Sequence, residues 1–600
     1  WCFRRGLAGG GRWTILLSLL IGVDMLAGDV VTVAFAVLAA LFWIGTELPS
    51  AERGTAARKI AGAVCLGSLL ALPQVVATWC WVPLTRRAIS GMKLEESLFF
   101  SLRPWRLVEF LVPFPFGENW DPDSLLTWAP SVFGHRASGF FTTLYAGALA
   151  PIGLIQTWRS RAPGLRFAKT FLLTGLFLSV APSLVPAEWG SRPSPLPLRY
   201  PEKFAVAAVF ALAIFAAHGV EVLRRESRSS RWLFGAAAVF ALLAVMADLF
   251  PSLVSRIAMS VVGTPRALAS LAVTEVPASL AEAGLLWAGT ACGVALMASR
   301  GRSSLALGVV LLTILPIAAT RRIAASYEEQ ILAPSPFARR IWKLDPEGRY
   351  RTLGESLFTG PPHTAPVRQI EVRAREWASN TQALWGRGTV LNGDFDGGDL
   401  SRLDALRRLA FVAAQNPDGT AFFAGLALRW GIRYREQIAL PGYQRIAGDG
   451  MQDWDEQAGA YPDVRLLERW TEENDLRKIA PGILSQPSGE VVLETGLARS
   501  GKARPGQLRM LERSPERFVA ETVCPDPTWL FVVRGFWDYR TVLIDGRPAE
   551  VVPAQIALSA LSVPEGTHRV EWREGLPGGH VSRWGPMLFV LISLVLIIRK

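Results

Sequence analysis

Apolar stretches of about 16 to 22 residues recur along the first half of the chain, and one more closes it. A helix needs roughly 20 residues to cross the ~30 Å hydrocarbon core of a bilayer. The pattern therefore predicts a polytopic α-helical membrane protein with about ten transmembrane helices in this fragment. We place them at residues 13–28, 30–47, 60–82, 138–158, 167–186, 203–223, 232–250, 276–298, 303–320 and 584–598.

Lys and Arg cluster in every second gap between the apolar stretches. The clusters lie at residues 4–12, 53–59, 159–166, 224–231, 300–302 and 599–600. Loops on the cytoplasmic side of a membrane carry the excess of basic residues, so this alternation orients the whole chain. The remaining segments should face away from the cytoplasm: residues 28–29, 83–137, 187–202, 251–275 and 321–583. We expect 251–275, which is amphipathic, to lie on the membrane surface.

Periodicity and composition divide the chain into four regions. Residues 1–323 form the predicted multi-pass domain, and residues 583–600 form the C-terminal helix. Between them we predict an extracytoplasmic mixed α/β region at 324–487, with an amphipathic helix over 399–413. A β-rich, sandwich-like region should follow at 488–582, because short β-branched runs alternate there with turn residues. Asp545-Gly546 is a two-residue hairpin turn sequence.

Composition narrows the class of protein further. Half of the residues are hydrophobic and the mean hydropathy is +0.27, which is too apolar for an ordinary soluble protein. The net charge of +12 follows largely from the short basic loops, and the chain carries no RNA- or DNA-binding motif, so we expect no nucleic-acid partner. Of five cysteines only Cys524 falls in the outer region, which excludes a disulfide framework there.

Motifs for several common chemistries are missing from the sequence. There is no Walker loop, no GxGxxG before a helix, no HExxH, no GxSxG and no paired CxxC. ATP-driven transport, dinucleotide chemistry and zinc hydrolysis therefore have no support. We assign no metal ligand, and dependence on a divalent cation stays open.

The predicted outer loop 83–137 concentrates charged and aromatic side chains. Its candidate substrate-binding residues are Arg103, Trp105, Glu118 and Asp121. Aromatic faces beside carboxylates and arginines suit a sugar or a phosphosugar. The same composition also suits a loop packed on lipid headgroups, and composition alone does not separate the two.

The next long outer loop is stiffened by four prolines between residues 193 and 201. It presents Arg192, Arg199, Glu202 and Lys203 where an apolar stretch begins. Arginine binds phosphate through two parallel hydrogen bonds, so a rigid basic rim suits a lipid-linked phosphate. Ordinary interfacial anchors are the alternative. Asp29, in the first outer turn, is the carboxylate that we assign as a candidate catalytic base.

Several short motifs occur in an order that resembles the YfhO-like family of bacterial membrane proteins. They are LAGD at 26–29, LPQ at 72–74, SLRPW at 101–105, VP at 112–113, FG at 116–117, LYAG at 144–147, RYPEKF at 199–204, GFW at 535–537, IDG at 544–546 and VPEGTH at 563–568. The matches run from about residue 26 to the end of the chain.

The resemblance implies a glycosyltransferase of the C-fold type in the bacterial cytoplasmic membrane. Its implied partners are the lipid bilayer, a polyprenyl-phosphate sugar donor, and a glycan, polymer or lipid acceptor on the outer face. In such transferases the catalytic carboxylate lies in the first outer loop near the N-terminus. This sequence begins at Trp1 and resembles the part after that loop, so we expect the main general base upstream.

A second hypothesis belongs to a different class. The apolar stretches would anchor a non-catalytic carbohydrate-binding domain that serves envelope polymer assembly or export. An Asp or Glu in an upstream outer loop would favour the transferase.

Overall fold

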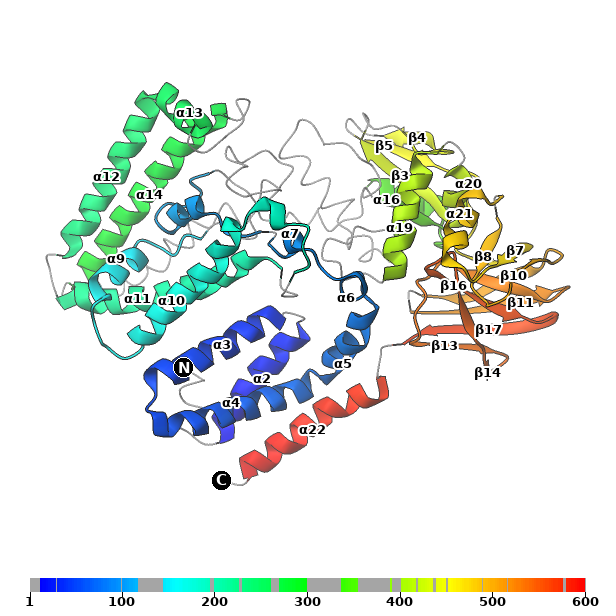
Figure 1. Ribbon diagram of the computed structural model, residues 1–600, viewed down its shortest axis with the longest axis horizontal. Coiled ribbons are helices and arrows are strands. Elements are labelled where there is room, and N and C mark those ends of the chain that lie inside the picture. Colours follow the sequence, from blue (N-terminus) through cyan, green and yellow to red (C-terminus); the bar gives the residue numbers. More distant parts are fainter. Residues whose placement is uncertain are drawn as a thin grey trace. The chain divides into compact units, whose positions relative to one another are not determined.

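The computed structural model describes most of the chain in two compact units (Figure 1). The helical unit comprises Trp1–Gln74, Met92–Ser326 and Arg583–Lys600, and the β-rich unit comprises Val75–Gly91 and Tyr327–Ser582. The described residues are 11–27, 30–98, 100–116, 144–194, 199–225, 229–260, 269–298, 336–353, 389–390, 401–416, 419–434, 439–448, 452–487, 489–514, 516–575 and 579–598.

The helical unit is built from long apolar helices joined by short helical turns. The longer ones are α2 (Gly11–Leu26), α3 (Val30–Glu47), α4 (Ser50–Leu70), α9 (Leu149–Thr157), α10 (Leu165–Val180), α11 (Ala205–Arg225), α12 (Ser229–Leu249), α13 (Pro251–Ser260), α14 (Ala269–Ala298) and α22 (Gly579–Ile598). The turns include α7 (Leu94–Ser97), η2 (Pro104–Phe110), η3 (Ala181–Leu184), η4 (Ala187–Trp189) and η5 (Pro201–Phe204).

Fewer helices than expected are long and apolar enough to cross a membrane. Among the described residues three such stretches qualify, at Leu165–Leu184, Pro201–Val222 and Ala272–Leu296, and two bent helix pairs raise the number to five. Three further apolar helices are shorter: Trp13–Leu26, Thr32–Glu47 and Trp584–Val595. The expectation of about ten spans is therefore wrong for the described part, and the predicted span 303–320 lies outside it.

Proline follows two sharp bends between apolar helices, one inside the predicted span 60–82 and one at the predicted end of the span 232–250. α4 meets the helical stretch Leu72–Leu84 at an angle of 81°, and Phe234–Leu249 meets α13 at 95°. Pro73 and Pro251 lie within the first two residues after these breaks. Proline lacks the backbone N–H and disfavours a helical residue before it, so an apolar run can hold two helices. α13 is thus a separate helix in the amphipathic stretch 251–275, whereas residues 269–275 begin α14.

Small residues let α10, α11 and α9 pack closely. A Cβ on Gly175 of α10 would lie 2.9 Å from the Cβ of Ala207 on α11, and Gly153 of α9 lies against the backbone of Phe215. Phe171 of α10 contacts Phe210 of α11 with ring centroids 6.3 Å apart. Rising residue numbers in α10 meet falling numbers in α11, so the two helices are antiparallel.

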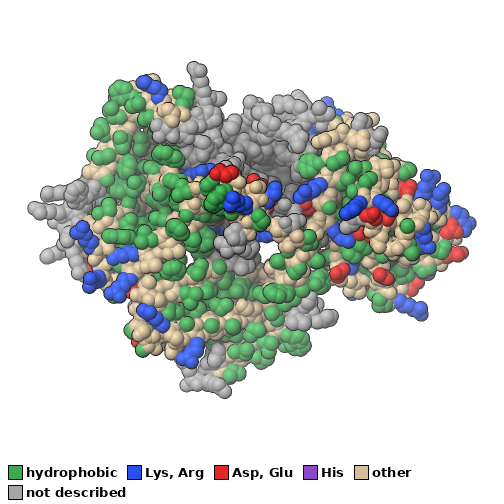
Figure 2. Space-filling view, in the orientation of Figure 1, with side chains coloured by type: hydrophobic (Ala, Val, Ile, Leu, Met, Phe, Trp, Pro, Cys, Tyr) green, Lys and Arg blue, Asp and Glu red, His purple; other side chains and the backbone are tan. Residues whose placement is uncertain are grey.

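Large apolar side chains remain exposed on the outward faces of several helices, as Figure 2 shows for the described atoms. On α12 these include Val239, Leu242, Leu243 and Met246, and on α22 Val590, Leu591 and Leu594. Exposed apolar surface of this extent marks a contact with lipid or protein.

The described residues of the β-rich unit form three sheets. The first has the order β2-β1-β3-β5-β4, the second β10-β11-β17-β13-β14, and the third β6-β12-β16-β15-β8-β7-β9. Their strands are β1 (Arg351–Leu353), β2 (Thr389–Val390), β3 (Leu428–Tyr434), β4 (Gln444–Gly448), β5 (Gln452–Glu456), β6 (Val464–Leu466), β7 (Arg469–Glu472), β8 (Val491–Leu493), β9 (Arg499–Lys502), β10 (Gln507–Arg513), β11 (Arg517–Cys524), β12 (Thr528–Val532), β13 (Arg540–Ile544), β14 (Arg547–Pro548), β15 (Val551–Ala554), β16 (Leu558–Val563) and β17 (Gly566–Glu574).

The second and third sheets share one hydrophobic core. Phe518 and Trp572 of the second sheet stack with ring centroids 5.6 Å apart, and they pack in one cluster with Leu530 and Leu561 of the third. The inward residues of both sheets therefore meet face to face, as in a sandwich. Helices α16 (Pro336–Leu344), α19 (Ser401–Ala414), α20 (Thr420–Gly425) and α21 (Leu476–Ser485) complete the unit, together with η1 (Val82–Leu84), α6 (Arg86–Ser90) and most of α5 (Leu72–Trp81).

In this unit the predicted turn and helix are present, whereas the predicted boundary between residues 487 and 488 does not separate the sheets. The predicted hairpin is present, since β13 and β14 pair Ile544 with Arg547 around Asp545 and Gly546. The predicted helix over 399–413 corresponds to α19. In contrast, β6 and β7 precede residue 488 and yet belong to the third sheet, so this sheet extends across the expected boundary.

Candidate functional site

A buried ionic cluster joins the predicted outer loop 83–137 to the start of α11. The guanidinium of Arg106 in η2 donates to both carboxylate oxygens of Glu109, at 2.5 and 2.9 Å. It also donates to Oε1 of Glu202 in η5 at 2.5 Å. All three side chains are no more than 2 % exposed. Removing one partner of such a buried pair costs about 3–5 kcal/mol, so the cluster holds the loop against η5.

Electrostatics keep this cluster charged at its centre. Burial by itself would lower the pKa of Arg106, but the adjacent carboxylates of Glu109 and Glu202 outweigh it and raise that pKa. Burial raises the pKa of Glu109, and Arg106 opposes this rise. Glu109 also accepts the backbone N–H of Leu144 at 3.1 Å. Two buried carboxylates thus share one guanidinium, which compensates one negative charge.

Backbone hydrogen bonds fasten the same two segments along their length. The N–H of Leu94 donates to the carbonyl of Arg192 at 2.7 Å, and the N–H of Glu202 donates to Phe100 at 2.9 Å. The side chain of Arg103 donates to the carbonyl of Ser183 at 3.3 Å. A backbone so connected presents its side chains in fixed positions.

Tyr200 lies at the centre of a half-buried group of side chains on these segments, which we call the Tyr200 patch (Arg199, Tyr200, Lys203 and Phe100). Its φ of +63° is left-handed, a conformation that costs a non-glycine residue of order 1–3 kcal/mol and persists only where the surroundings enforce it. Arg199 and Lys203 both lie over its ring, at 4.9 and 5.2 Å from the centroid. Phe100, also at positive φ, packs against it with ring centroids 5.2 Å apart.

Further aromatic and basic side chains lie on the same connecting segments. Trp105 in η2 is 55 % exposed. Arg192 is exposed and lies over the ring of Trp189, 4.7 Å from its centroid. Basic groups beside exposed aromatic faces can bind an anion through the former and a sugar ring through the latter.

The patch lies where two candidate spans meet. Leu165–Leu184 ends just before it and Pro201–Val222 begins within it. The opposite ends of α10 and α11 carry the basic clusters around residues 159–166 and 224–225. The turn between α3 and α4 lies there too, because Glu47 accepts the N–H of Phe167 at 2.8 Å. The antiparallel helices therefore separate the patch from these basic loops.

The structure brings some of the predicted site residues together and not others. Arg103, Arg192, Arg199 and Lys203 lie on the joined segments, whereas Glu202 is buried in the ionic cluster and is not part of a rim. Asp29, Glu118 and Asp121 lie outside the described residues. Sequence reasoning missed the roles of Arg106 and Glu109, although their spacing of three residues in a charged loop was a usable signal.

The residues that the structure describes contain no group of three or more His, Cys, Asp or Glu side chains able to hold a metal ion. In the described part of this region arginine and lysine side chains lie beside aromatic rings, an arrangement that is able to bind an anion. Comparisons of the chain with protein-family models, with curated proteins and with solved structures find no match.

Proposed function

We propose that this protein is a glycosyltransferase of the bacterial cytoplasmic membrane. It would transfer a sugar from a polyprenyl-phosphate donor to a cell-envelope glycan, polymer or lipid on the outer face. The observation that supports the proposal most directly is the Tyr200 patch, because it presents two basic residues at the junction of two candidate membrane spans.

The polyprenyl chain, the phosphate and the sugar of such a donor each have a matching surface in the helical unit. The polyprenyl chain would lie along apolar helix faces, which puts its phosphate at the membrane boundary. The start of η5 and α11 is at such a boundary if Pro201–Val222 crosses the membrane. Arg199 and Lys203 would contact the phosphate there, and exposed Trp105 offers a flat face to the sugar.

The reaction needs a base and a stabilised leaving group. A carboxylate would take the proton of an acceptor hydroxyl, whose oxygen attacks the anomeric carbon of the sugar. The bond from that carbon to the phosphate oxygen breaks, and the phosphate leaves with both electrons. Arg199 and Lys203 would stabilise its developing charge. Asp29 is the candidate base in this proposal.

The test is sugar transfer from a labelled polyprenyl-phosphate sugar in membranes that contain the protein. We expect Arg199→Ala to lower the rate by about 30- to 1000-fold, equivalent to roughly 2–4 kcal/mol. Arg199→Lys should restore little of it, because an ammonium lacks the planar fork of a guanidinium. Arg161→Ala, at the opposite end of the helices, is the matched control. Equal rates in the wild type and both Arg199 variants would remove the patch from the donor site.

A non-catalytic anchor for a carbohydrate-binding domain is the second candidate function. The pocket described below favours it over other binding roles. Sugar binding by the intact protein without any transfer would select it.

A further inference from the structure

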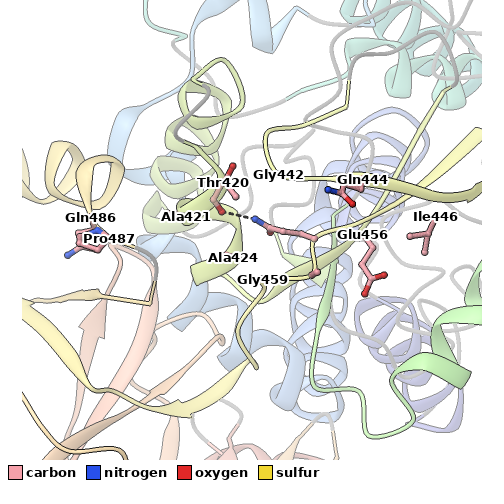
Figure 3. Close-up of a pocket in the computed structure, with 12 residues that line it drawn as sticks. Thr420, Ala421, Ala424, Gly442, Gln444, Ile446, Glu456, Gly459, Gln486 and Pro487 are labelled. Atoms are coloured by element: carbon pink, nitrogen blue, oxygen red, sulfur yellow. Dashed lines mark hydrogen bonds between the residues drawn. The ribbon is translucent and has the colours of Figure 1, made fainter.

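A pocket of about 560 Å³ opens within the β-rich unit (Figure 3). Its walls come from α20, the sheet-edge strand β4, the end of β5 with the turn after it, and the residues that follow α21. The volume falls in the range of pockets that hold small molecules. Gly442 lines one wall and lies close against Thr420. Its φ is +78°, and a Cβ at this position would collide with the Thr420 side chain.

Buried amide groups in this pocket have unused hydrogen-bonding capacity. Gln457 is 1 % exposed, and its Nε2 donates to the carbonyl of Thr420 at 2.7 Å, the dashed line in Figure 3. Its Oε1 is buried and accepts from no described group, and the Oε1 of Gln486 is in the same state. Most buried polar atoms in proteins are hydrogen-bonded. Both oxygens are closed to solvent, so a ligand in the pocket would bond to them after a rotation of the carboxamide groups.

The charge of the described lining is close to neutral. Oε1 of Glu456 accepts two hydrogen bonds from Arg429, at 2.9 and 2.6 Å, so its charge is compensated. None of the described lining residues is Lys or Arg, and most of the others are small. A phosphate or sulfate would lack a cationic partner among these residues, and an acyl chain would leave the amides unsatisfied.

We propose that this pocket binds a neutral saccharide. Carboxamides both donate and accept hydrogen bonds, as sugar hydroxyls do, and three glutamines (Gln444, Gln457 and Gln486) line the pocket. The saccharide's role as the acceptor of a transfer reaction rests on the proposed function. Its binding does not, and it can be measured without transfer.

Gly459 and Gln444 can be substituted to test the pocket without disturbing the fold. Gly459 lines the pocket, and a Cβ there would meet no heavy atom within 4 Å, so Gly459→Leu should fold and add bulk at the pocket wall. Gln444 is exposed on β4, an edge strand of the first sheet. Gln507 is exposed on β10, an edge strand of the second sheet, and is absent from the pocket lining. Gln507→Ala is therefore a matched control for Gln444→Ala.

The experiment uses the full chain in lipid nanodiscs and saturation-transfer NMR. The probes are neutral oligosaccharides of glucose, galactose, mannose and N-acetylglucosamine, with oligogalacturonate as the charged comparator. We expect binding of at least one neutral probe. Gly459→Leu and Gln444→Ala should each weaken it about tenfold or more, and Gln507→Ala should leave it unchanged. Thermal unfolding of each variant checks that it is folded.

Three results would overturn the proposal. They are no binding of any neutral probe, binding that survives in folded Gly459→Leu, or stronger binding of oligogalacturonate than of every neutral probe. The two proposals fail separately in these assays. Neutral saccharide binding without transfer would remove the transferase and keep the pocket, whereas transfer without pocket-dependent binding would do the reverse.

Discussion

At the scale of residues, the chain uses arginine and carboxylate pairs to fix irregular backbone. Arg106 ties η2 to η5 in the helical unit, and Asp463 receives Arg351 at 2.6 Å in the β-rich unit. Turn geometry is also held by side chains: Asp545, at φ +51°, accepts the N–H of Arg569 at 2.8 Å. Such local contacts can be tested one at a time.

The Asp545–His568 pair should make the β13–β14 hairpin sensitive to pH. His568 Nδ1 lies 2.7 Å from Asp545 Oδ2, and this hydrogen bond raises the pKa of His568 above its usual 6.5. The N–H of Arg569, and then His568, lower the pKa of Asp545 below its usual 3.8. The histidine's contribution to stability is present below pH 6.5 and is lost as pH rises through the raised pKa, whereas the aspartate's is lost as pH falls below 3.8.

We expect Asp545→Asn to lower the pKa of His568 towards 6.5, measured by NMR titration of labelled histidines. Asparagine tolerates positive φ, so the turn should persist. The other four histidines serve as internal references. Asp526→Asn, which breaks a different ion pair with Arg504, is the control. An unchanged His568 pKa in Asp545→Asn would show that the pair does not form in solution.

At the scale of elements, close helix approach depends on small residues. Gly175 allows α10 to touch α11, and Gly153 allows α9 to touch it from another direction. Small residues at interfaces are the usual means by which membrane helices associate, since lipid offers no competing hydrophobic drive. Proline lies where two of these elements end. Pro73 follows the end of α4 inside a predicted span, and Pro251 follows the end of α12, where the sequence also predicts that the span ends.

Gly175→Leu should destabilise the helical unit by about 1–3 kcal/mol, the usual cost of overpacking. Its Cβ would already lie 2.9 Å from the Cβ of Ala207 and from the backbone of Ala208. Thermal unfolding in detergent, followed by size-exclusion fluorescence, measures the effect. Gly235→Leu on α12 is the matched control, because a Cβ there meets nothing within 4 Å. Equal melting temperatures for the two variants would contradict the packing argument.

At the scale of the whole molecule, the basic loops and the Tyr200 patch should lie on opposite sides of a membrane. The antiparallel pairing of α10 and α11 separates them within the helical unit. If the alternation of basic clusters orients the chain, the patch and the β-rich unit both face the outer side. Topology is therefore the property on which the proposed site depends most.

We expect cysteines at exposed outer positions to react with an impermeant maleimide in intact spheroplasts. In a chain whose native cysteines are replaced by serine, Arg192→Cys and Arg509→Cys should label. Arg161→Cys, in the loop before α10, should label only after the membrane is permeabilised. Labelling in the reverse order would invert the orientation and place the Tyr200 patch in the cytoplasm.

The sequence by itself determined features that depend on neighbouring residues. Apolar runs predicted helices such as α10 and α11, and alternating β-branched runs predicted strands such as β8 and β17, because both periodicities are local. The Asp-Gly turn followed from the positive φ that these residues tolerate.

Only the tertiary structure decided which distant residues meet. Arg106 and Glu202 are 96 positions apart, and nothing in either loop alone predicts their pairing, which turns Glu202 from a rim residue into a buried one. β6 and β7 join the third sheet across an expected boundary for the same reason. The pocket of the β-rich unit forms where α20, β4 and the residues after α21 come together. Such contacts depend on how elements pack, and packing is set by the shapes of surfaces that are far apart in sequence.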